Sequence, residues 1–179
     1  MLSVTAADTE NKQLKPELEQ LFREHAQMLY RTAYAMLGSA ADAEDVLQSI
    51  FLRLLRRELP SDLARNPQGY FYRAAVNTSL NVIRSRKRAE LVGDAARFET
   101  PVEHESLNAD SELHQRLTAA ISELEPEVAQ VLILRYIHGH TDAEIARMLG
   151  VSRGTVAMRL FRSRLRLKKL MQDSTGEKK

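Results

Sequence analysis

Apolar residues recur at three- and four-residue steps along the first half of this chain, which is the spacing of amphipathic helices. The pattern predicts a first helix over 16–37 and a second over 39–59, whose early acids and late arginines complement the helix dipole. A third helix is predicted over 66–88, because Asn66 can cap it and Pro67 can take the first helical position.

The helical spacing is lost over 89–111, a segment that contains a proline and a glycine. From Ala89 to Val128 the chain holds ten acidic residues and two arginines. We interpret 89–111 as an acidic linker, and both a plain solvated tether and an electrostatic role fit its composition. The predicted fold is all-α, with two small helical domains, 14–88 and 112–171, joined by this flexible linker.

The last two predicted helices have the spacing of a helix-turn-helix. Thr141 and Glu144 form a capping-box pattern for a helix over 142–149, Gly150 ends that helix, and Ser152 can cap the final one. Six positions are expected to share its core: Ile145, Ala146, Leu149, Val151, Val156 and Leu160. The outward positions of the final helix, whose width suits a DNA major groove, are then Arg153, Thr155, Ala157, Met158, Arg159 and Arg162.

The net charge of +2 says little, because 26 basic side chains nearly balance 24 acidic ones. Their placement says more: the stretch from Arg153 to Lys169 has seven basic residues and no acid, as a phosphate-contacting helix needs. The absence of cysteine excludes disulfides, thiolate catalysis and cysteine-ligated zinc. No apolar run is long enough to span a membrane, so a cytoplasmic protein is predicted.

Two further surfaces are predicted in the first domain. One face of the second helix is already apolar, and the opposite face is a mixed stripe that fits either a solvated surface or a helix-docking interface. The members of that stripe are Asp45, Gln48, Ser49, Leu52, Arg53 and Arg56. The third helix combines aromatics, amides and a basic end, which suits single-stranded nucleic acid, although Phe71 is expected in the core and Tyr70 or Tyr72 could join it.

Three stretches carry a family resemblance: DAEDVLQSIFLRLLRR, NPQGYFYRAAVNTSLNVIRSRKR and LEPEVAQVLILRYIHGHTDAEIARMLGVSRGTVAMRLFRSRLRLKK. In this order they resemble regions 2.2, 2.3–2.4 and 4 of the extracytoplasmic-function (ECF) group of bacterial RNA polymerase sigma factors. The similarity spans about residues 18–170. It implies an alternative sigma factor that binds core RNA polymerase, directs it to promoters through −10 and −35 elements, and promotes transcription initiation. No catalytic residue, metal or cofactor is implied.

The resemblance also implies partners and residue roles. The implied partners are promoter DNA, the β′ clamp helices for region 2, the β flap for region 4 and, as a further candidate, an anti-sigma factor. Polymerase contacts fall on Asp45, Gln48, Phe51, Leu52, Arg53 and Arg56. Contacts to the −10 element fall on Tyr72, Arg73, Asn77, Asn81, Arg84, Arg86, Lys87 and Arg88, with Asn77 at the position that binds an extruded base. Contacts to the −35 element fall on Arg153, Thr155, Ala157, Met158, Arg159, Arg162 and Arg164.

Some positions depart from the family pattern. Ser49 replaces a usual acid, Leu55 stands where tryptophan is common, and Ala129 stands where arginine is frequent. Ala157 and Met158 replace a frequent basic–serine pair, and such apolar side chains could contact thymine methyl groups. The −35 preference is therefore expected to differ from that of relatives.

Two other functions compete with this interpretation. A stand-alone regulator that binds duplex DNA without polymerase would share the helix-turn-helix but leave the first three helices unexplained. A metal-dependent hydrolase would need a ligand set drawn from His138, His140, Asp142 and Glu144 with Asp42, Glu44 and Asp45. No HExxH, phosphate-binding glycine loop or nucleophile motif accompanies these residues.

Overall fold

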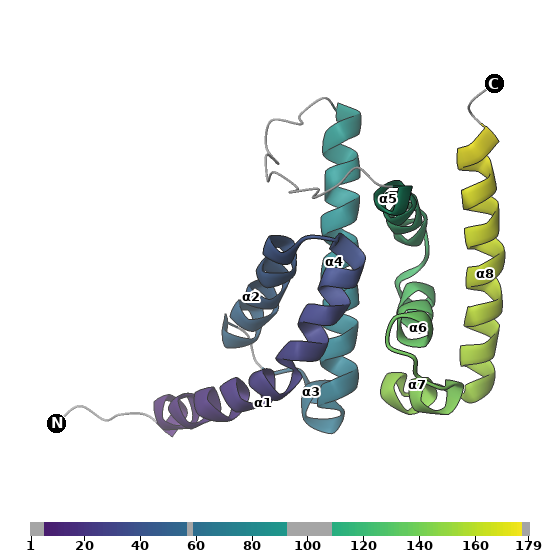
Figure 1. The fold of residues 1–179 in the computed structure, drawn as a ribbon. Helices are drawn as coiled ribbons and strands as arrows, with labels where there is room; N and C mark the ends of the chain where they lie inside the picture. Colours follow the sequence, from purple (N-terminus) through teal and green to yellow (C-terminus); the bar gives the residue numbers. More distant parts are fainter. Residues whose placement is uncertain (1–5, 57–58, 93–108, 177–179) are drawn as a thin grey trace.

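The computed structural model describes residues 6–56, 59–92 and 109–176, which form eight helices and no strand (Figure 1). The first four helices are α1 (Ala6–Leu37), α2 (Ala40–Arg56), α3 (Ser61–Arg65) and α4 (Pro67–Val92). The last four are α5 (Ala109–Ser122), α6 (Pro126–Tyr136), α7 (Asp142–Leu149) and α8 (Arg153–Gly176). The all-α prediction is confirmed. Within the described ranges, no helix is both long and apolar enough to cross a membrane.

The helix boundaries differ from the predicted ones at three places. α1 begins at Ala6, so Pro16 lies inside it rather than at its start. The short helix α3 was not predicted, because five residues are too few to show a periodic pattern. Helices also enter the predicted linker from both sides, through α4 and α5, and the remainder of that segment, 93–108, lies outside the described residues.

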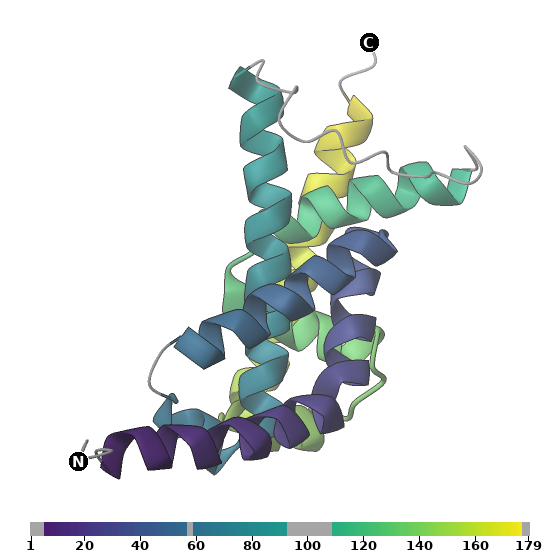
Figure 2. The ribbon, with the colours of Figure 1, turned by 90° about the vertical axis from the view of Figure 1, so that its left-hand side faces the viewer.

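In the N-terminal part, α1 and α2 pack against one side of α4 (Figure 2). Their shared core is apolar and includes Leu29, Val46, Ile50, Leu54 and Phe71. Phe71 is fully buried, as predicted, and its ring meets the edge of Phe22 at a centroid distance of 5.8 Å. This core fixes α2 with its apolar face inward and leaves the opposite stripe on the surface.

In the C-terminal part, α7 and α8 form the predicted helix-turn-helix. The Thr141 hydroxyl accepts the Glu144 N–H, while the Glu144 carboxylate accepts the Thr141 N–H at 2.8 Å, so the capping box is confirmed. Gly150 ends α7 at φ 67°, a left-handed conformation that favours glycine. Ser152 caps α8 by accepting the Thr155 N–H. The predicted interior is confirmed as well: Ile145, Ala146, Leu149, Val156 and Leu160 are buried and Val151 is half-buried.

The two parts share a hydrophobic core instead of standing apart. Met36 from α1 and Tyr72, Val76 and Leu80 from α4 belong to the same buried cluster as the interior of α5–α8. Consequently α5, α6 and α7 lie between α4 and α8 (Figure 1). α4 is thus buried on two faces, one toward each part of the molecule.

Candidate polymerase and nucleic-acid interfaces

The outer face of α8 is open to solvent at its N-terminal half. Within this predicted −35 set, Arg153, Ala157, Met158, Arg162 and Arg164 are exposed, and Thr155 and Arg159 are half-buried. Met158 is 52% exposed and the neighbouring Phe161 58%, so an apolar strip lies between the arginines. Such a strip can contact thymine methyl groups in a major groove, whereas flanking guanidinium groups can reach phosphates.

Arg164 has a side-chain partner outside α8. Its Nε donates to the hydroxyl of Tyr136 at 2.8 Å, and its guanidinium lies 5.9 Å from the centre of that ring. Both side chains are exposed, so the contact holds Arg164 near the start of the turn after α6 without burying its charge. A phosphate contact by Arg164 would compete with this cation–π arrangement.

The mixed stripe on α2 is accessible. Asp45, Gln48, Leu52, Arg53 and Arg56 are exposed, with Leu52 at 45%, and Phe51 is half-buried. Phe51 packs its ring against Phe22 at 4.9 Å, and Arg53 donates to the Thr78 hydroxyl at 3.3 Å. The stripe therefore has an apolar centre surrounded by charged residues. The opposite face of α2 is packed in the core of the N-terminal part, which holds the helix in place.

The predicted −10 residues on α4 divide into three groups. In the first group, side chains bond to α5–α6. The Tyr72 hydroxyl donates to the Gln130 carbonyl at 2.9 Å, and the Asn77 Oδ1 accepts from the Gln130 Nε2 at 3.1 Å. Arg84 donates to the carbonyls of Ser122 and Leu124 at 3.0 and 2.8 Å. Tyr72 is fully buried, and desolvation raises its pKa well above the ordinary value.

Lys87 completes this first group through an ion pair with Glu123, whose pKa is lowered chiefly by the hydrogen bond from Lys87. In the second group, cations pair within the N-terminal part: Arg73 with Asp62 at 2.7 Å, and Arg86 with the buried carboxylate of Asp42. The third group, Asn81 and Arg88, is exposed. Half of the predicted −10 set therefore contacts the C-terminal part of the chain.

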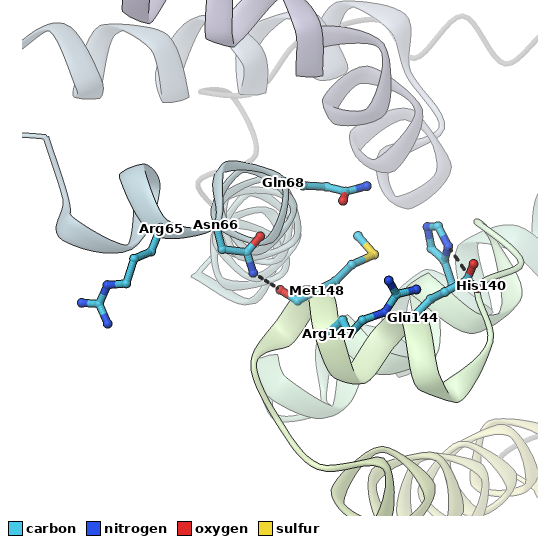
Figure 3. A pocket seen from close by; sticks show the side chains of 7 residues that line it. All are labelled: Arg65, Asn66, Gln68, His140, Glu144, Arg147 and Met148. Atoms are coloured by element: carbon cyan, nitrogen blue, oxygen red, sulfur yellow. Dashed lines mark hydrogen bonds and ion pairs between the residues drawn. The ribbon is translucent and has the colours of Figure 1, made fainter.

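A second junction joins the start of α4 to the end of α7. Asn66 accepts the Gly69 N–H at its Oδ1 and donates from its Nδ2 to the Met148 carbonyl at 2.8 Å (Figure 3). A β-carbon on Gly69 would lie 2.0 Å from that carbonyl oxygen, so only glycine permits this approach. An open pocket of about 450 Å³ lies beside the junction and is lined by Arg65, Asn66, Gln68, His140, Glu144, Arg147 and Met148.

A third junction is formed by His138. Its Nε2 lies 2.9 Å from the Thr32 hydroxyl oxygen, and that hydroxyl donates to the Met28 carbonyl, so the imidazole Nε2–H is the donor to Thr32. The ring also meets the edge of Tyr72 at 5.7 Å. Burial lowers the pKa of His138 to about 4, with further contributions from His140 and Arg31. The imidazole is therefore neutral at physiological pH.

Acidification from pH 7.5 to 5 is expected to weaken the junction at His138. Because the pKa is lower in the folded chain than in the unfolded one, the stabilisation is full above about pH 6.5 and is lost as pH falls toward 4. With allowance for solvent screening, the loss at pH 5 is on the order of 1 kcal/mol. Urea unfolding at both pH values measures it, and His138→Gln should remove this part of the pH dependence. An identical dependence in the variant would contradict the assignment.

Several of the histidines and acids weighed as metal ligands make other contacts. His138 bonds Thr32, His140 lies 3.8 Å from Glu144, and Asp42 pairs with Arg86. Across the described residues, no cluster of three or more potential ligands is present.

Comparison with known proteins identifies the family. Residues 21–89 match Sigma-70 region 2, and residues 114–167 match Sigma-70 region 4. The chain is 34% identical over 142 residues to the ECF RNA polymerase sigma factor SigL of Mycobacterium tuberculosis, covering 78% of this chain and 80% of SigL. The chain belongs to the ECF family of RNA polymerase sigma factors. The predicted resemblance is thereby confirmed, and this family consists of transcription initiation factors, not enzymes.

Other similar proteins are also ECF RNA polymerase sigma factors. The ECF sigma factor SigE of Mycolicibacterium smegmatis is 32% identical over 166 residues, covering 90% of this chain and 64% of SigE, so this chain spans somewhat less than two thirds of that relative. SigW of Bacillus subtilis is 29% identical over 156 residues, covering 81% of this chain and 83% of SigW.

Two solved structures are similar to this chain at 22% identity. They are the sigma factor RpoE with the anti-sigma factor NepR from Bartonella quintana, at TM-score 0.44 and coverage of 90% of this chain and 98% of that one, and CnrH with the cytosolic domain of CnrY, at TM-score 0.48 and coverage of 89% and 90%.

Sequence reasoning missed the residues that join region 2 to region 4. Gln130 and His138 lie on apolar or turn segments that gave no sign of a partner in the other region. Gly69 lies inside a helical pattern, and its close approach to the Met148 carbonyl is visible only in the structure.

Proposed function

We propose that this chain directs core RNA polymerase to promoters, with region 2 on the polymerase and the −10 element and region 4 on the −35 element. The observation that carries the proposal is the co-occurrence, in family order, of region 2 with an exposed mixed stripe on α2 and region 4 with an intact capped helix-turn-helix. We propose that the protein acts in the cytoplasm, because its proposed partners, promoter DNA and RNA polymerase, are there.

The exposed face of α2 is the proposed polymerase contact. An apolar centre at Leu52 surrounded by charged residues is typical of a helix-docking interface. Burial of the apolar centre contributes affinity, and the charged residues around it fix the orientation of the partner helix. The proposed partner segment is the clamp-helix pair of the β′ subunit. Asp45, Gln48, Arg53 and Arg56 surround Leu52 and Phe51 as the polar part of the contact.

The proposed −10 contact is centred on Asn77. Its carboxamide offers a donor and an acceptor, the pair needed to hydrogen-bond the edge of an extruded base, and it is exposed on α4. Arg84, Lys87 and Arg88 lie along the helix beyond it and would follow the strand's phosphates.

The proposed −35 contact is the outer face of α8. Arg153, Arg159 and Arg162 are the candidates for guanine edges or phosphates, and Ala157 with Met158 for thymine methyl groups. Region 4 would also contact the β flap. Since RpoE and CnrH were solved with NepR and CnrY, an anti-sigma factor is a further proposed partner.

Asn77→Ala is expected to impair open-complex formation about 5- to 150-fold while leaving polymerase binding unchanged, because a lost bidentate base contact costs about 1–3 kcal/mol. Permanganate footprinting of the −10 region measures melting, and co-purification with core polymerase measures binding. Gln68→Ala, which removes an exposed amide near the start of the same helix, is the matched control. Equal loss of melting and polymerase binding would contradict the role given to Asn77.

Promoter binding with and without core polymerase separates this function from a stand-alone regulator. The free chain is expected to bind a −35/−10 duplex weakly, and core polymerase to convert it to tight, salt-sensitive, promoter-specific binding. Tight specific binding by the free chain, unchanged by core, would favour the regulator.

A further inference from the structure

An open pocket of about 450 Å³ lies beside the junction between the start of α4 and the end of α7 (Figure 3). Its walls come from three parts of the chain: the end of α3 with the start of α4, the turn that follows α6, and α7. Pockets that take small ligands commonly have volumes of roughly 300–1,000 Å³. The volume therefore suits a ligand of about nucleotide size and is much larger than a single inorganic anion needs.

The walls of this pocket are held by contacts within the chain. Asn66 bonds the Gly69 N–H and the Met148 carbonyl, and the second of these bonds joins the α4 wall to the α7 wall. On the other side, the capping box of Thr141 and Glu144 holds the start of α7. A pocket whose walls are already fixed loses little freedom when a ligand binds, and this favours affinity.

Positive charge predominates around the pocket. Arg65 and Arg147 are exposed, and neither guanidinium group has a hydrogen bond or salt bridge with another described residue. Glu144 is the one carboxylate among the lining residues, and it already accepts hydrogen bonds of 2.8 Å from the Thr141 N–H and hydroxyl. His140 lies 3.8 Å from that carboxylate and adds an imidazole that can donate to an anion.

The lining groups differ along the length of the pocket. Arg65 lies at one end, and His140 lies at the other end with Arg147 nearer to it (Figure 3). The side chain of Met148 lies between the two ends, so an apolar thioether separates the cationic groups. Guanidinium groups bind phosphate through paired hydrogen bonds, and a methionine sulfur packs well against an aromatic ring. The lining therefore suits a ligand with both a phosphate group and a flat organic part.

We propose that this pocket binds an organic phosphate of about nucleotide size. Arg147 and His140 hold the phosphate groups, and Met148 packs against the organic part. Arg65 lies at the other end and donates to oxygen atoms of the ligand there. The site shares no residue with the proposed polymerase, −10 and −35 sets, so the proposal goes beyond the promoter function and does not depend on it.

Binding at this pocket is coupled to the packing of region 2 on region 4. Arg65 belongs to α3 in region 2, and Arg147 belongs to α7 in region 4. A ligand that needs both walls binds only when the two regions are packed together, and by linkage it stabilises that packing. The proposal therefore gives a small phosphorylated metabolite a direct influence on the arrangement of the two regions.

Isothermal titration calorimetry of the full chain, with ADP as the probe in about 150 mM salt, tests the ligand class. ADP is expected to bind with a Kd below about 1 mM. Adenosine lacks the phosphates and inorganic phosphate lacks the organic part, so each is expected to bind at least tenfold more weakly. No binding of ADP, or equal binding of ADP and either of the two smaller probes, would overturn the proposal.

Two substitutions test the residues. Arg65→Gln and Arg147→Gln are each expected to weaken ADP binding at least fivefold, because each removes a charged donor from an exposed side chain. Arg88→Gln is the matched control, since it makes the same change at an exposed arginine near the other end of α4, and it should bind ADP as the wild type does. Wild-type affinity in both pocket variants, or an equal loss in Arg88→Gln, would overturn the proposal.

The basic residues of α8 are the competing site for a phosphate probe, and amide NMR spectra of the ¹⁵N-labelled chain separate the two. ADP is expected to shift the signals of residues 65–69 and 140–148 and to leave those of residues 153–169 unchanged. Shifts confined to residues 153–169 would place the ligand on α8 and overturn the proposal. None of these measurements uses polymerase or promoter DNA, so their failure is distinct from a failure of the proposed sigma function.

Discussion

Leu52→Glu is expected to abolish promoter-directed transcription. Leu52 is the exposed apolar centre of the α2 stripe, so the variant would bury an unpaired carboxylate in the polymerase interface. Such a charge costs several kcal/mol, which corresponds to a loss of affinity of about hundredfold or more. Fluorescence anisotropy of the labelled chain titrated with core polymerase measures it.

The matched control for this prediction is Leu91→Glu, because Leu91 is also an exposed leucine, at 78%, but lies near the end of α4. Both variants should fold with stability within about 0.5 kcal/mol of wild type, as surface changes usually do. Polymerase binding by Leu52→Glu at wild-type strength, or equal loss in Leu91→Glu, would show that α2 is not the docking face.

Tyr72→Ala is expected to destabilise the chain by about 3–5 kcal/mol, because it empties the space of a fully buried aromatic ring where the two regions meet. Tyr72→Phe keeps the ring and removes only the hydrogen bond to the Gln130 carbonyl, which is worth about 0.5–1.5 kcal/mol. Urea denaturation at neutral pH measures both.

Tyr136→Ala serves as the control, since Tyr136 is 57% exposed. A Tyr72→Ala protein of wild-type stability would contradict the packing of region 2 on region 4. This series also bears on the predicted −10 role of Tyr72. Its side chain is fully buried between the two regions, so any contact with DNA requires the regions to separate first.

The helix-turn-helix could be predicted from the sequence because its determinants are local. Thr141 and Glu144 cap across one turn, Gly150 supplies the left-handed residue, and Ser152 caps the next helix, all within twelve residues. Caps and turns of this kind depend on neighbours in the chain and so can be recognised without the fold.

The packing of region 2 on region 4 could not be predicted in this way. α4 places Phe71 in one core and Tyr72, Val76 and Leu80 in another, and periodicity indicates that such residues are buried but not against which partner. The same limit applies to the candidate nucleic-acid interface on α4. The amide of Asn77 and the charge of Arg84 indicate nucleic-acid ligands from the sequence alone. Their contacts with Gln130 and Ser122 depend on tertiary structure and could not be predicted.

Mapping of transcript 5′ ends tests the central claim most directly. Core polymerase would be incubated with fragmented genomic DNA of the source organism, with and without the purified chain, and the transcripts sequenced. The account predicts new start sites that appear only with the chain and share a −35 and a −10 sequence at constant spacing. Identical start sites in both reactions, with no shared upstream sequence gained, would contradict it.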